Sequence, residues 1–114
     1  MTVEFYKTEG GRKPAGEFIK SVSDVKLQAK IIRSLKLLED YGTELREPDS
    51  KPLGDGIFEL RTIQSNNISR CLYFFFKGDK AIVTNGFIKK QQATPSEEIE
   101  TAKSRKADYE RRNP

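Results

Sequence analysis

The sequence contains no histidine and only one cysteine, and these absences narrow the chemistry open to the chain. Histidine is the commonest metal ligand and the side chain that titrates nearest to neutral pH. One cysteine and scattered carboxylates give no metal-ligand spacing, so we expect neither a metal nor a cofactor. Cys71 cannot form an internal disulfide, and its apolar neighbours predict a small buried side chain. Any catalysis would therefore use lysine, arginine, tyrosine or glutamate.

Long apolar runs are also missing. No stretch approaches the roughly 18 apolar residues of a membrane span, and the first residues lack the apolar core of a leader peptide. With the single cysteine, this predicts a cytoplasmic protein with no membrane partner. No glycine-rich phosphate loop is present. The length of 114 residues predicts one domain, residues 1–114, whose modest core leaves room only for a surface groove.

The positive charge is concentrated in one segment. The chain has a net charge of +4, and residues 51–90 hold seven lysines and arginines against three acidic residues. The surplus of this segment, 7 − 3 = 4, equals the whole net charge, so the rest of the chain is balanced. An excess of cations confined to one segment indicates an anionic partner.

The hydrophobic pattern predicts an α+β fold with the order β-α-α-β-β-β-α. The short connections between the last three strands favour an antiparallel meander, and residues 43–56, rich in proline and glycine, are predicted to be a surface loop. We expect a twisted antiparallel sheet with two N-terminal helices and a C-terminal helix. The expected strands are residues 2–8, 57–63, 68–77 and 80–88, and the expected helices are residues 14–22, 24–41 and a last one that starts at Pro95.

Both long helices carry recognisable start signals. Asp24 or its neighbour Ser23 can cap the second helix, and Gly42 suits its end. Thr94 followed by Pro95 and Glu97 predicts a capping box at the last helix. The second helix also presents basic residues at intervals of four and three, which fit either a solvated face or a supplementary contact to a polyanion. These residues are Lys26, Lys30 and Arg33.

The expected register brings like charges together. A hairpin loop at residues 64–67 sets Arg61 opposite Arg70, and two arginines facing each other across a strand pair destabilise a sheet. A two-residue turn at Gly78-Asp79 then sets Ile68 opposite Lys89. Arg61, Arg70 and Lys89 would thus project from one face at one end of the sheet. The other end of that face is expected to carry Phe74, Phe76 and Val83.

A cluster of three cations calls for an anion. Glu59, the neighbour of Arg61 on that face, would neutralise only part of the charge. Phosphate suits the rest, because arginine offers a planar fork to phosphate oxygens and lysine a mobile point charge. Lys51, just before the first meander strand, is placed to close the same groove.

Several motifs over residues 51–110 occur together in one known group of proteins. They are KPLGDGIFELR, SRCLYFFF and GFIKKQQATPSEEIETAKSR, in that order. The chain resembles the RelE/ParE toxin superfamily, in particular its phage-derived HigB-like branch. The resemblance implies the toxin of a type II toxin–antitoxin system, a metal-independent endoribonuclease that cleaves mRNA on the ribosome. It also implies a cognate antitoxin, often of helix-turn-helix type, that neutralises the toxin.

Carried over by position, the family's basic active-surface residues are Lys51, Arg61, Arg70, Lys89 and Lys90. The catalytic set is then Arg61, Arg70, Lys89, Lys51 and Glu59. We expect Lys90, which points away from Lys89, to contact RNA or the ribosome together with the basic helix face. Tyr109 is a further candidate for an RNA contact, by stacking on a base, although core packing is the favoured role for it. Tyr73 of the Arg-x-x-Tyr motif faces the other side of the sheet. Some HigB-like toxins have a histidine near this surface, and its absence here leaves the acid and base among lysine and glutamate.

Two other functions stay open at this point. The same fold serves as a non-catalytic inhibitor of DNA gyrase in the ParE branch, where it acts as a binding module. A plain nucleic-acid-binding domain is the third possibility, although the chain lacks the interleaved exposed aromatics of a single-strand reader.

Overall fold

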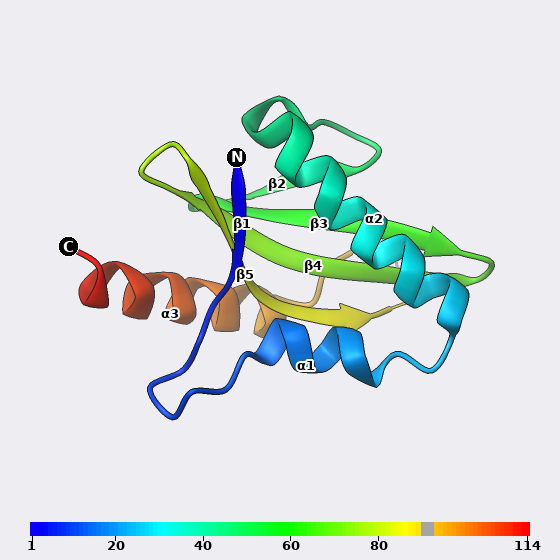
Figure 1. The fold of residues 1–114 in the computed structure, drawn as a ribbon, viewed down its shortest axis with the longest axis horizontal. Helices are drawn as coiled ribbons and strands as arrows, with labels where there is room; N and C mark the ends of the chain where they lie inside the picture. Colours follow the sequence, from blue (N-terminus) through cyan, green and yellow to red (C-terminus); the bar gives the residue numbers. More distant parts are fainter. Residues whose placement is uncertain (90–92) are drawn as a thin grey trace.

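The computed structural model describes residues 1–89 and 93–114 of the chain. It contains a five-stranded sheet in the order β1-β5-β4-β3-β2, covered by three α-helices (Figure 1). The predicted α+β class and the predicted order of elements are confirmed, with one further strand. The elements are β1 (Thr2–Phe5), α1 (Pro14–Ser21), α2 (Val25–Tyr41), a 3-10 helix (Gly42–Glu44), β2 (Ser50–Gly54), β3 (Ile57–Gln64), β4 (Asn67–Phe76), β5 (Lys80–Ile88) and α3 (Ser96–Arg112).

The added strand, β2, lies where the sequence predicted only a loop. Residues 43–56 hold the end of the 3-10 helix and then β2, which pairs antiparallel with β3 at one edge of the sheet. Pro52 is compatible with this position because a proline without an N–H is tolerated on an edge strand. The register slips between Pro52 and Gly54, so this short, irregular strand has little of the alternation by which strands are identified.

The central meander has the predicted antiparallel pairing, and β1 closes the other edge parallel to β5. Arg61 pairs with Arg70 as expected. At the second turn the prediction was wrong by one residue, because Phe76 pairs with Lys80 across a three-residue connection that contains Lys77 and Gly78 at positive φ.

A bulge restores the predicted register farther along. Leu72 pairs with Asn85 and Tyr73 with Val83, so Thr84 is the extra residue in β5. Beyond the bulge Arg70 faces Phe87, as predicted. Before it, each β5 side chain lies on the face opposite to the one expected. Val83 therefore packs with Tyr73 rather than with Phe74, and that prediction was wrong.

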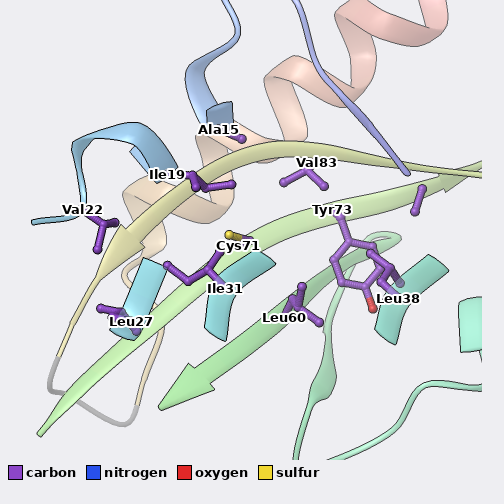
Figure 2. Packing of buried hydrophobic residues seen from close by; sticks show 11 residues of the cluster. Ala15, Ile19, Val22, Leu27, Ile31, Leu38, Leu60, Cys71, Tyr73 and Val83 are labelled. Atoms are coloured by element: carbon purple, nitrogen blue, oxygen red, sulfur yellow. The ribbon is translucent and has the colours of Figure 1, made fainter. Parts of the chain in front are cut away.

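Each face of the sheet has its own core. Helices α1 and α2 cover one face, where Ile19, Leu27 and Ile31 meet strand residues such as Leu60 and Tyr73 (Figure 2). Helix α3 covers the opposite face. There Ala102 and Tyr109 pack with alternate residues of the same strands, among them Leu72, Phe74 and Ile82. We call the face under α3 the α3 face.

The ends of α2 agree with the sequence signals, whereas the start of α3 does not. Asp24 caps α2, since its side chain accepts hydrogen bonds from the backbone N–H groups of Lys26 and Leu27. Gly42 ends the helix at φ 53°, a left-handed conformation that glycine adopts without strain. The predicted capping box of α3 was wrong. Helix α3 begins at Ser96 with Pro95 at its cap position, and no side chain there bonds a backbone N–H.

Candidate active site on the α3 face

The candidate site lies at the end of the α3 face where β3 and β5 finish and β4 begins (Figure 1). Strand pairing brings Lys51, Glu59 and Leu72 into one row, and Arg61, Arg70 and Phe87 into the next. The backbone N–H of Lys89 donates to the carbonyl of Ile68 at 2.9 Å, so β5 follows β4 to its start. The register thus gathers residues from four strands at one end of the sheet.

Glu59 is the centre of this arrangement. Its side chain is 3% exposed, and one oxygen, Oε2, lies 3.7 Å from Nε of Arg61 and 3.7 Å from Nε of Arg70. These separations are those of ion pairs rather than hydrogen bonds. The shared carboxylate explains how two arginines can stand directly opposite each other in a stable sheet.

The two arginines differ in their access to solvent. Arg70 is fully buried, and its Nη1 donates to the carbonyl of Ala93 at 3.3 Å. The side chain of Arg61 is 21% exposed. Within the described residues, Nε of Arg61 has no hydrogen-bond acceptor. Arg61 is therefore the arginine of the pair that can reach an incoming anion.

The strand pairing places two of the predicted lysines at this end of the sheet. Lys51 is exposed on β2 and pairs in register with Glu59. Lys89 is half-buried and follows the last residue of β5. Lys90 lies outside the described residues. The rim of the site that the structure describes therefore has one partly exposed arginine and two lysines.

Thr94 belongs to this cluster although the sequence suggested another role for it. Its hydroxyl donates a hydrogen bond to Oε1 of Glu59, whereas the ion pairs with the two arginines are made by the other oxygen, Oε2. Sequence patterns interpret a threonine before proline as a helix cap. The contact between Thr94 and Glu59 on β3 is visible only in the tertiary structure.

The basic stripe of α2 lies at the same end of the molecule. Lys26, Lys30 and Arg33 are all exposed, and Nζ of Lys30 lies 3.5 Å from the carbonyl of Ile63 at the end of β3. Helix α2 covers the face opposite to α3. The stripe is thus separated from Glu59 by the sheet and approaches the site around the β3–β4 turn.

Tyr109 belongs to the core, which corrects its expected contact with RNA. The residue is 7% exposed, its ring meets Phe74 and Phe76 edge-on, and its hydroxyl donates to Oε1 of Glu4 at 3.0 Å. Burial, followed by the nearby Glu4 carboxylate, raises the pKa of Tyr109 to about 12. A residue that is only 7% exposed offers no free ring face on which a base could stack.

Two predicted core residues have the expected environment. Tyr73 is 1% exposed on the face opposite to the arginines and is hydrogen-bonded to Ser50. Burial raises the pKa of its hydroxyl, and the bond to Ser50 offsets part of that effect. Cys71 is buried beside it, and desolvation raises the pKa of the thiol to about 12. Such a thiol is inert as a nucleophile.

Residues 1–89 and 93–114 hold neither a cluster of metal-ligating side chains nor a helix that could span a membrane. No group of three or more histidine, cysteine, aspartate or glutamate side chains there is arranged to hold a metal ion. In the same ranges, every helix is too short or too polar to cross a membrane.

Comparisons with known proteins identify the family. Residues 17–107 match the family described as phage derived protein Gp49-like (DUF891). Two curated relatives, both named probable endoribonuclease HigB1, come from the CDC 1551 / Oshkosh and ATCC 25618 / H37Rv strains of Mycobacterium tuberculosis. Each is 39% identical to this chain over 61 residues, which cover 54% of this chain and 48% of the relative.

The chain therefore spans about half the length of the curated relatives it matches. The family match is broader, since residues 17–107 run from α1 to α3 and include every member of the cluster around Glu59. The chain belongs to the phage-derived Gp49-like family, which confirms the phage-derived, HigB-like branch predicted from its motifs.

Proposed function

We propose that this protein is the toxin of a type II toxin–antitoxin system and an endoribonuclease that cleaves mRNA. The observation that carries the proposal is the partly exposed Arg61 beside a buried carboxylate, with Lys51 and Lys89 at the rim. The curated relatives named probable endoribonuclease support the same activity.

The proposed reaction uses the RNA's own 2′-hydroxyl. This oxygen attacks the adjacent phosphorus and forms a P–O bond, while the bond to the 5′-oxygen of the next nucleotide breaks. A base takes the proton of the 2′-hydroxyl, and an acid protonates the leaving oxygen. Negative charge grows on the phosphoryl oxygens, and a positioned donor there contributes about 3 kcal/mol. No metal is required for these steps.

In this proposal Arg61 holds the phosphoryl oxygens with its guanidinium. Lys51 and Lys89 supply the acid and the base, with Glu59 as the alternative base. Arg70, which the sequence placed among the direct contacts, acts instead through Glu59 and the carbonyl of Ala93, because a side chain with no exposed surface cannot touch RNA.

We further propose that the substrate is mRNA on the translating ribosome, which would place the activity in the cytoplasm. The exposed stripe of α2 provides Lys26, Lys30 and Arg33 for phosphates of the RNA or of ribosomal RNA. Lys90 stays a predicted contact of the same kind. A neutralising antitoxin, of the predicted helix-turn-helix type, is the proposed protein partner.

Inducible expression in bacteria tests the function. The wild-type protein should arrest growth, and primer extension on total RNA should show new 5′ ends inside coding regions. Arg61→Ala should abolish both effects if Arg61 acts in cleavage. Arg12→Ala is the control for it, because Arg12 is an exposed arginine that pairs with Glu17 and lies far from the site in sequence.

The alternatives predict other results. Growth arrest with induced DNA damage and intact mRNA would replace this proposal with inhibition of DNA gyrase. Salt-sensitive binding of RNA without growth arrest or cleavage would leave a nucleic-acid-binding module.

A further inference from the structure

The chain that enters α3 is tied to the sheet by one polar residue from each of three strands. Glu59 of β3 accepts from the hydroxyl of Thr94, and Arg70 of β4 donates to the carbonyl of Ala93. Asn85 of β5 donates from Nδ2 to Oε1 of Glu98 at 2.9 Å. The anchors are thus spread across the width of the meander and lie on its α3 face.

The contact at Thr94 differs from the other two because it bears directly on the candidate site. Within the described part of the chain, it is the one hydrogen bond that the Glu59 carboxylate accepts. It engages Oε1 and leaves Oε2 directed at Arg61 and Arg70. The rotation of the carboxylate about its last bond is therefore set by a residue from another element.

The hydroxyl of Thr94 has no part in starting the helix. Helix α3 begins two residues later, at Ser96, and no side chain caps it. The next contact along the chain belongs to Asn85, whose Oδ1 accepts from the hydroxyl of Thr84 at 2.6 Å. Asn85 is 5% exposed and fixes Glu98, so the first turn of α3 is held in place without Thr94.

We infer that Thr94 is a positioning residue for the proposed cleavage, acting through Glu59. Its hydroxyl holds Oε1, so that Oε2 faces Arg61 and keeps that guanidinium aimed at the phosphate. The inference rests on the proposed function. Removal of the hydroxyl leaves a buried carboxylate oxygen without its donor, and the carboxylate can then turn away from Arg61.

The test compares Thr94→Val with Thr94→Ser in a reconstituted translation reaction with a defined mRNA. The rate constant is measured at saturating toxin, and the half-saturating concentration is measured separately. A hydrogen bond to a buried charged group is worth about a ten- to hundredfold change in an equilibrium, and we expect Thr94→Val to lose a comparable factor in the rate constant. Thr94→Ser should stay near the wild-type rate, with half-saturation unchanged in both.

The matched control is Ser96→Ala, which removes an exposed hydroxyl two residues away at the start of the same helix. It should cleave like the wild type. A double-mutant cycle with Glu59→Gln separates positioning from general damage, because residues that act through one another are not additive. Thr94→Val should cost little once Glu59 has become glutamine. If the valine variant does not fold, Thr94→Ala replaces it in the cycle.

Wild-type cleavage is measured in the same experiment, so the two proposals fail separately. An inactive wild-type protein would overturn the proposed function. An active wild type with an equally active Thr94→Val variant would overturn the role of Thr94 alone. Full additivity with Glu59→Gln, or an equal loss in Thr94→Ser, would also overturn it.

Discussion

Arg61 and Arg70 lie directly opposite each other on β3 and β4, and the Nε atoms of both are 3.7 Å from the same oxygen of Glu59. Two neighbouring cations in a sheet would repel if nothing lay between them. The buried carboxylate compensates the charge of both arginines. Their roles differ, because Arg70 is buried and can only support the site, whereas Arg61 is partly exposed and can contact a ligand.

The first prediction concerns Glu59→Gln. The substitution keeps the shape of the side chain and removes the charge that both arginines share, so it should lower the free energy of unfolding by about 3 kcal/mol, as for a broken buried ion pair. Urea denaturation measures the change. Glu39→Gln is the control, because Glu39 pairs with Lys36 on the surface, where its side chain is 43% exposed. It should cost less than about 1 kcal/mol, and equal losses in the two variants would contradict the account.

The second prediction separates the two arginines by stability. Arg70→Ala should lower the free energy of unfolding by about 3–5 kcal/mol, because it leaves a cavity and takes from the buried Glu59 carboxylate its fully buried cation. Arg61→Ala should lower it by about 1 kcal/mol, because partial exposure lets water replace some of the interaction. Thermal or urea denaturation of both variants checks this order. The reverse order would contradict the account, because it would make Arg61 more important for stability than the buried Arg70.

The third prediction concerns the basic stripe of α2. Each phosphate contact on single-stranded RNA adds about 0.7 to the slope of log affinity against log salt. Replacing Lys26, Lys30 and Arg33 by alanine should therefore reduce this slope by roughly 2 if all three contact phosphates. Titration of a fluorescent single-stranded RNA at several salt concentrations measures it.

A variant with the same loss of charge controls for the general effect of net charge. It carries alanine at three exposed lysines outside the stripe, namely Lys7, Lys13 and Lys20. Its slope should change much less than that of the α2 variant. Equal slopes in the two triple variants would show that the stripe has no special place in binding.

The fourth prediction is a dependence of stability on high pH. The ordinary pKa of tyrosine is 10.0, and that of folded Tyr109 is raised to about 12. Between these values the unfolded chain releases the proton and the folded chain retains it, so the unfolded state is favoured as pH rises. The contribution of Tyr109 is present below pH 10 and is lost as pH approaches 12.

Tyr109→Phe removes this titration. Between about pH 9.5 and about pH 11.5, a range that includes the ordinary pKa of tyrosine, the variant should lose less stability than the wild type. Urea denaturation at each pH measures the loss. The cleavage activity of the variant should be unchanged, because Tyr109 is part of the core. A steeper loss in the variant, or a loss of cleavage, would contradict that placement.

Much of the site was predictable because β3 and β4 are joined by a short turn, which fixes their register. The pairing of Arg61 with Arg70 followed from the register alone and is confirmed. The pairing of Arg70 with Phe87 was also predicted correctly, although the prediction missed two irregularities in β5. The one-residue slip at the turn and the bulge at Thr84 cancel, so Arg70 faces Phe87 although Val83 has moved to the other face.

Other features could not be predicted from local patterns. Strand β2 depends on its pairing with β3, since Pro52 and the glycine turn weaken any strand signal. The contact of Thr94 with Glu59 joins residues that are 35 positions apart, and local sequence offered the threonine a plausible role as a helix cap. The burial of Arg70 likewise depends on how α3 enters its layer.

Single-turnover cleavage of a translated mRNA by Arg61→Ala, compared with Arg12→Ala, tests the central claim most directly. If the partly exposed arginine beside Glu59 stabilises the charge on the phosphate, Arg61→Ala should cleave about a hundredfold more slowly than the wild type, as when one oxyanion donor is lost. Arg12→Ala should cleave at the wild-type rate, since its guanidinium is paired on the surface with Glu17. Cleavage by Arg61→Ala at the wild-type rate, by a folded protein, would show that the cluster around Glu59 is not the active site.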